Sequence, residues 1–363
     1  MAVGSTRMPA VGALALGAAL LAGCSSIGPA TVPHDRIDYA NAIGDSWKAQ
    51  TLLNIVKLRY ADVPIFLEPT QVIAGYQLQS TIAGSVNLGN FNAGQIGPFT
   101  ATGGLAAGGS YTDRPTVIYS PLTGTDFLKR LLTPVPPSSV LFLLQSGYSA
   151  ERVMAVMVDS INGLDNRSIR LARPADPEFT RLVELMREGQ LAGAIQFRID
   201  RPKEKEGPES ALVVFGPNSD PELAAKGREI RKLLGLRPDL QRINVFYGGH
   251  SGKDDEIDMA TRSMLQIMLE FSAFVEVPDA DVAGGKAMPI PPDMRALPPL
   301  MRIHGGSEKP ADAFVAAEYD GRWFWIADAD IRSKSMFGAI ILLFSIADTG
   351  IKGSAPVVTV PAQ

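Results

Sequence analysis

A long segment in the first third of the chain alternates apolar and polar residues with a period of two. From Val72 to Leu88 most of the apolar residues occupy even-numbered positions, and most of the polar residues occupy odd-numbered positions. Such alternation places each set on one face of a strand of unusual length. Turn residues follow from Asn90 to Pro98, and a second alternating run, rich in Gly and Ala, extends from Phe99 to Tyr111. We therefore expect one long antiparallel hairpin over residues 72–111.

The N-terminus has the composition of a secretory signal. A single cation, Arg7, precedes an uncharged run from Val11 to Ala22. This run is shorter than the roughly 20 residues that a membrane-spanning helix needs, so we interpret it as a cleaved signal peptide. It ends in the sequence Leu21-Ala22-Gly23-Cys24.

This sequence resembles the lipobox of bacterial lipoproteins, in which a branched apolar residue and two small residues precede an acylated cysteine. The resemblance implies that signal peptidase II cuts before Cys24 and that this cysteine carries fatty acyl chains such as palmitate. Several acyl chains give stable membrane anchoring. Ser25 stands where an Asp would retain such a protein at the inner membrane, which favours the outer membrane and a body facing the periplasm. The alternative is a secreted protein whose signal happens to end in cysteine.

Composition excludes several further classes of protein. Cys24 is the only cysteine, so no disulfide can form within the chain. The formal charge of −4 becomes −5 when Arg7 leaves with the signal, and this acidity speaks against a nucleic-acid partner. The longest later apolar run, Met336 to Ala347, is also too short to span a bilayer as a helix and fits a buried core helix.

The mixture of patterns predicts an α+β fold with helical segments, the long N-terminal hairpin, a mixed α/β middle and a small C-terminal hairpin-plus-helix unit. Six prolines and a Gly284-Gly285 pair between Val277 and Pro299 have linker composition. We expect a signal peptide over 1–23, a lipidated tether over 24–36, a main body over 37–276 that includes the hairpin, a linker over 277–299 and a C-terminal unit over 300–363.

Local signals predict the elements of the body. Asp220 as N-cap with Pro221 at the first helical position indicates a helix that ends before Gly235. A strand over Ile243–Tyr247 and then one long helix from Ile257 to Phe271 are expected next. Other helices are expected from Tyr39 to Tyr60, within Thr125–Ile161, from Pro177 to Glu188 and from Arg332 to Ala347, and other strands over Ala194–Ile199, Ala211–Phe215 and Val357–Val360.

A glycine-rich loop from Tyr247 to Asp255 resembles a phosphate-binding loop only in part. Gly248 and Gly252 are separated by three residues where a P-loop has four, and Asp254 follows the lysine where Ser or Thr should hold magnesium. The carboxylates after the loop would repel an anion. We expect them to stabilise the N-terminus of the helix predicted to follow.

The same loop contains His250 and Ser251, which are candidates for a serine hydrolase. Their sequence lacks one residue of the Gly-x-Ser-x-Gly elbow. His34 lies in the tether, so a triad would use His250 or His304, and only geometry can recognise such a triad. The three scattered histidines and the single cysteine have no metal-ligand spacing, so we expect no metal and no cofactor.

The C-terminal unit contains a second hairpin and a candidate binding surface. Phe314–Tyr319 and Arg322–Ile326 flank Asp320-Gly321, a strong hairpin signal. Trp323 and Trp325 share one face of the second strand, where they could stack on a sugar or a protein partner. The alternative is that both are core residues.

These patterns favour a non-catalytic, lipid-anchored envelope protein that binds a protein partner, or other copies of itself, in a larger assembly. A second hypothesis is an oligomeric outer-membrane channel in which hairpin 72–111 enters the membrane. It has a general likeness to lipid-anchored secretion channels of the curli-exporter kind. A third hypothesis, the serine hydrolase, depends on Ser251 and a histidine partner.

Overall fold

The computed structural model describes residues 27–73, 76–88, 101–113, 116–200, 210–216, 220–295 and 299–347. Helices and several sheets, one of them mixed, confirm the predicted α+β class. The described residues form two compact units, one of 27–64 with Leu131–Ala347 and the other of Ile65–Arg130. This division differs from the predicted boundaries, because the C-terminal elements belong to the same unit as the main body. Among the described residues, no helix is both long and apolar enough to cross a membrane.

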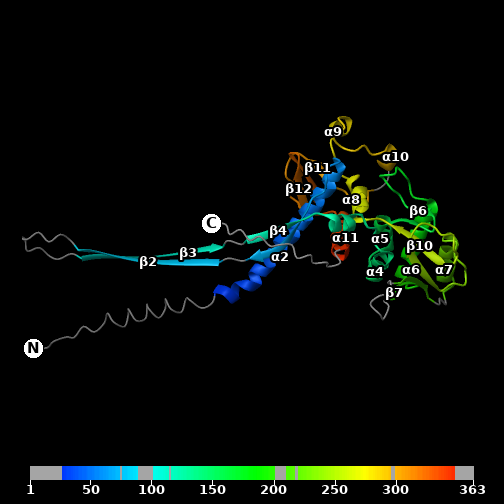
Figure 1. Ribbon diagram of the computed structural model, residues 1–363, viewed down its shortest axis with the longest axis horizontal. Coiled ribbons are helices and arrows are strands. Elements are labelled where there is room, and N and C mark those ends of the chain that lie inside the picture. Colours follow the sequence, from blue (N-terminus) through cyan, green and yellow to red (C-terminus); the bar gives the residue numbers. More distant parts are fainter. Residues whose placement is uncertain are drawn as a thin grey trace, which may run out of the picture. The chain divides into compact units, whose positions relative to one another are not determined.

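The first unit begins with the long helix α2, Ile27–Arg59 (Figure 1). It starts inside the predicted tether, nine positions before that tether's expected end at residue 36 (36 minus 27). Leu52, Ile55 and Val56 are fully buried, and the helix packs against α8 (Met264–Ser272) and β12 (Ala313–Tyr319). The helix therefore joins elements that are distant in sequence.

A six-stranded sheet forms the centre of this unit in the order β6-β5-β10-β9-β8-β7. Only β9 and β10 pair in parallel, and the other neighbours are antiparallel. The strands are β5 (Val158–Ile161), β6 (Leu164–Asp165), β7 (Ile195–Asp200), β8 (Ser210–Phe215), β9 (Arg242–Tyr247) and β10 (Glu256–Thr261).

Helices cover one face of this sheet. Leu141, Met186 and Ile230, from three different helices, enclose a common apolar core with Val213 and Met259 of the strands. The opposite face carries exposed positions, namely Gln196, Arg198, Arg242, Asn244 and Phe246. The helices of this layer are α4 (Pro137–Gln145), α5 (Ala150–Met157), α6 (Pro177–Leu191) and α7 (Pro221–Leu233).

The predicted long helix from Ile257 to Phe271 is wrong. Glu256–Thr261 form strand β10, which pairs in parallel with β9, and helix α8 begins only at Met264. Ser263 caps that helix with a capping box that includes Gln266, and the helical spacing of the apolar residues across this boundary was fortuitous. The carboxylates after the glycine loop therefore do not cap a helix.

The C-terminal hairpin is confirmed. Asp320 and Gly321 have φ angles of 49° and 72°, which a type I′ turn requires at both central positions. A third strand that the sequence did not predict, β11 (His304–Gly306), pairs with β13 (Arg322–Ala327), which also pairs with β12. Helix α11, Ile331–Ala347, follows, and the predicted edge strand Val357–Val360 lies outside the described residues.

The predicted linker contains two short helices, α9 (Asp279–Ala283) and α10 (Pro292–Arg295). Between them Ala287 is 3% exposed, and the amide of Met288 donates to the carbonyl of Arg59 at 3.0 Å. These contacts fasten the segment to the end of α2.

The second unit contains the predicted long hairpin, and its backbone pairing confirms the prediction. Its strands are β1 (Phe66–Ile73), β2 (Tyr76–Leu88), β3 (Ala101–Asp113) and β4 (Thr116–Leu122). Helix α3, Thr125–Leu132, follows β4, and the rings of Phe66 and Phe127 lie 5.6 Å apart between centroids.

Candidate functional site

The long hairpin is a two-stranded ribbon whose register is the same from Gln71 to Leu88, beyond a shift between Pro69 and Gln71. Ile73 pairs with Thr116 in the β1–β4 part, and Tyr76 pairs with Asp113 in the β2–β3 part, so no residue is gained or lost between them. The β2–β3 part has no register shift as far as its last pair, Leu88 and Ala101 (Figure 1). We call residues 66–88 and 101–122 the ribbon.

The register decides which residues share a face of the ribbon, because directly opposite positions lie on the same face. Beyond the first pair, Tyr76 and Asp113, apolar positions of β2 meet apolar or small positions of β3, and polar positions meet polar or small ones. The first face contains Leu78, Ile82, Val86 and Leu88 opposite Tyr111, Ala107, Gly103 and Ala101. The second contains Gln77, Gln79, Thr81, Ser85 and Asn87 opposite Thr112, Ser110, Gly108, Gly104 and Thr102.

The ribbon also combines an uncharged sequence with open edges. The sequence has no Asp, Glu, Lys or Arg between Glu68 and Asp113. Among the described residues, β2 and β3 pair only with each other, so each presents a row of backbone N–H and C=O groups at its outer edge. Such edges pair readily with another chain, and an isolated two-stranded ribbon is marginally stable in water.

Ser251 does not lie in the arrangement of a serine-hydrolase triad. Its hydroxyl and its backbone amide both donate to Asp258 Oδ2, each at 2.6 Å. His250 Nδ1 lies 3.8 Å from the same carboxylate oxygen, and no hydrogen bond between Ser251 and His250 occurs in the described part of the chain. A triad needs the imidazole between the hydroxyl and the carboxylate. Here the carboxylate contacts the serine directly and fastens the loop to β10.

His304 belongs to the other sheet of the first unit. Its Nδ1 lies 3.0 Å from Glu276 Oε2, and its ring centroid lies 5.5 Å from that of Trp325. Trp323 and Trp325 are partly exposed, with the ammonium of Lys309 5.2 Å from the Trp323 ring. Phe324 and Ile326, on the opposite face of the same strand, are fully buried core residues. The tryptophans are therefore surface residues whose rings already have neighbours.

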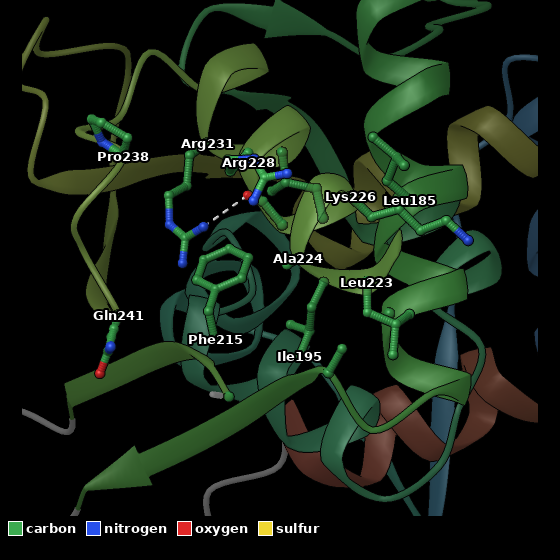
Figure 2. A pocket seen from close by; sticks show the side chains of 15 residues that line it. Leu185, Ile195, Phe215, Leu223, Ala224, Lys226, Arg228, Arg231, Pro238 and Gln241 are labelled. Carbon is green, nitrogen blue, oxygen red and sulfur yellow. Dashed lines mark hydrogen bonds between the residues drawn. The ribbon is translucent and has the colours of Figure 1, made fainter. Parts of the chain in front are cut away.

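A cavity of about 290 Å³ lies beside the β7–β8 pair, between α6 and α7 (Figure 2). Sequence analysis did not find it, since its residues come from four separate segments. They are Leu185, Gly189, Ala194, Ile195, Phe215, Gly216, Leu223, Ala224, Lys226, Gly227, Arg228, Ile230, Arg231, Pro238 and Gln241.

A buried ionic network is the other feature that sequence analysis missed. Arg262, 2% exposed, donates to the carbonyl of Ala155 at 3.0 Å and to the carbonyl of Arg167. Glu270, 5% exposed, accepts from Ser168 and Ile169. The network joins the loop after β6 to α8, which indicates a structural role.

Two points of the sequence analysis remain, namely metal binding, which was not expected, and the acylated cysteine. In the parts of the chain with described coordinates, no group of three or more His, Cys, Asp or Glu is placed to hold a metal ion. Cys24 lies outside the described residues, so its acylation stays a prediction.

Comparison with known proteins gives no relative from which a role could be inferred. No protein family, no curated protein and no solved structure matches the chain.

Proposed function

We propose that this chain is a non-catalytic assembly module of the bacterial envelope, anchored by lipid on Cys24, whose ribbon pairs with the ribbons of other copies. The observation that carries the proposal is that β2 and β3 pair only with each other among the described residues, so that the outer edge of each strand is open there. Backbone groups at a strand edge gain hydrogen bonds when a further strand is added. A second copy offers a strand of the same length and pattern.

The two faces of the ribbon support the same proposal. An apolar face that stays in water is unfavourable, and neighbouring copies would cover it while they pair the edges. The anchor adds to this effect, because acylation at Cys24 would confine the copies to one membrane surface and raise their local concentration. We place that surface at the outer membrane, with the body in the periplasm.

Charge substitutions on the two faces test this proposal. The double variant Ile82→Asp and Val86→Asp adds two charges to the apolar face, whereas Thr81→Asp and Ser85→Asp adds the same charges to the polar face of the same strand. Assembly through the apolar face predicts that the first variant dissociates and the second remains assembled. Equal assembly of both variants and the unchanged chain, by light scattering in mild detergent, would contradict it.

A second proposal is that the assembled ribbons form an outer-membrane channel. It is supported by the uncharged sequence and by two strands of 13 residues each, longer than the roughly 9–11 residues that a tilted membrane strand needs. Open edges in lipid would require a closed ring of copies. Ion flux across liposomes that contain the chain, lost in the Ile82→Asp and Val86→Asp variant, would favour this proposal over assembly outside the membrane.

The contacts of Ser251 do not support the serine-hydrolase hypothesis, because its hydroxyl is bonded to Asp258 and not to a histidine. Labelling of Ser251 by a fluorophosphonate, absent after Ser251→Ala, would overturn the non-catalytic part of the proposal. No labelling of the folded chain is the expected result.

A further inference from the structure

The cavity beside α7 has an unbalanced charge. Its lining contains three basic side chains, Lys226, Arg228 and Arg231, and no acidic one. Lys226 is neutralised by Glu188 at 3.0 Å and Glu222 at 2.8 Å. Arg228 and Arg231 make no ion pair within the described residues, although the charge of Asp239 acts on Arg231.

Arg231 is a buried cation without a carboxylate at ion-pair distance in the described part of the chain. It is 9% exposed, and it donates through Nε to the carbonyl of Leu240 at 2.7 Å and through Nη1 to the carbonyl of Gly227 at 3.0 Å. These oxygens satisfy donors but carry no net charge. No carboxylate of the described residues lies within ion-pair distance of Arg231. A buried charge in this state is costly unless an anion compensates it.

The surroundings concentrate positive potential at this point. Burial and the neighbouring Arg228 lower the pKa of Arg231, whereas the carboxylate of Asp239 acts in the opposite direction, and a guanidinium stays protonated in proteins. The guanidinium carbon lies 4.1 Å from the ring centroid of Phe215, which partly offsets the charge through the face of the ring (Figure 2). Arg228 is exposed and makes no ion pair within the described residues, so its guanidinium is free to reach a bound anion.

The rest of the cavity is small, and apart from the polar side chain of Gln241 its remaining side chains are apolar. Leu185, Ile195, Leu223 and Ile230 contribute hydrocarbon, and Ala224 together with Gly227 leaves the space that longer side chains on α7 would fill. A Cβ at Gly227 would lie 3.5 Å from Arg231 Nη1, so the glycine brings the helix backbone close to the guanidinium. The volume of about 290 Å³ lies at the lower end of the range for ligand pockets, roughly 300–1,000 Å³.

We propose that this pocket binds a small organic anion, with the anionic head at Arg228 and Arg231 and a short apolar body against Leu223, Ile230 and Phe215. Guanidinium groups bind carboxylates and phosphates through charge-assisted hydrogen bonds. The inference is independent of the ribbon and of the proposed assembly.

Calorimetric titration of the full chain with three probes tests both halves of the ligand. Hexanoate has a head and a body, inorganic phosphate has only an anionic head, and hexanol has only a body. Hexanoate is expected to bind more tightly than either of the others. Arg228→Gln should weaken hexanoate binding about tenfold or more, the usual effect of losing a hydrogen bond to a charged group.

Two further variants separate the pocket from general effects of charge. Ala224→Leu fills the cavity without a charge change and should abolish hexanoate binding. Arg181→Gln removes an exposed arginine that lies outside the lining and should leave binding unchanged. The proposal is overturned if hexanoate binds no better than phosphate or hexanol, or if Arg228→Gln binds as the unchanged chain does. Because Arg228 is exposed, Arg228→Gln should have the melting temperature of the unchanged chain, which shows that the variant is folded.

Discussion

The carboxylate of Glu270 accepts a hydrogen bond of 2.6 Å from the hydroxyl of Ser168. Its second oxygen accepts from the backbone amide of Ile169 at 2.8 Å, and its charge, with that of Asp159, offsets the buried cation of Arg262. Because Glu270, Ser168 and Arg262 are buried, the loss of one partner leaves the others uncompensated.

Glu270→Ala should therefore destabilise the first unit by about 1–3 kcal/mol, the usual cost of leaving a buried hydrogen-bond donor unpaired. Glu270→Gln, which keeps an acceptor for Ser168, should cost less than the alanine variant. Chemical denaturation followed by circular dichroism measures both. A loss below about 1 kcal/mol for the alanine variant would show that the network does not hold α8 in place.

The second prediction concerns pH. Burial and then the hydrogen bond to Asp281, 2.9 Å from the phenol oxygen, raise the pKa of Tyr60 from 10.0 to about 12. The folded chain thus holds this proton more tightly than the unfolded chain does. The resulting stability is fully present below pH 10 and is lost as pH rises through about 12. Tyr60→Phe should reduce this loss of stability, measured as the fall in melting temperature between pH 10 and about 12. A fall as steep as that of the unchanged chain would contradict the role of Tyr60.

The third prediction compares two glycines. A Cβ at Gly305 would clash with the backbone carbonyl oxygen of Glu276, so Gly305→Ala should displace β11 and cost about 1–3 kcal/mol. Gly338 lies within α11 with no atom within 4 Å of a built Cβ, so Gly338→Ala should stabilise the chain by about 0.5–1 kcal/mol. Thermal melts measure both changes. If both substitutions raise the melting temperature, the close packing of β11 against Glu276 is contradicted.

Local signals in the sequence predicted local structure well. Period-two alternation predicted the ribbon, Asp220 and Pro221 marked the start of α7, and Asp320-Gly321 marked the C-terminal turn. In each case the deciding residues are close in sequence or repeat with a fixed period, so the pattern itself contains the information.

Features that depend on distant pairing could not be predicted in this way. Residues 257–261 have helical spacing with the residues that follow, but parallel pairing with β9 makes them a strand. Ser168 and Glu270 are 102 positions apart, and the cavity around Arg231 joins four segments. Nothing in a single sequence indicates which distant segments will meet.

The mass of the full chain in mild detergent, by light scattering, tests assembly through the ribbon most directly. The comparison is a variant in which a short Gly-Ser turn replaces residues 76–113. Assembly predicts a uniform species of several times the mass of one mature chain for the full chain and a single-chain species for the variant. A full chain of single-chain mass, or an assembly that persists without residues 76–113, would contradict the proposal.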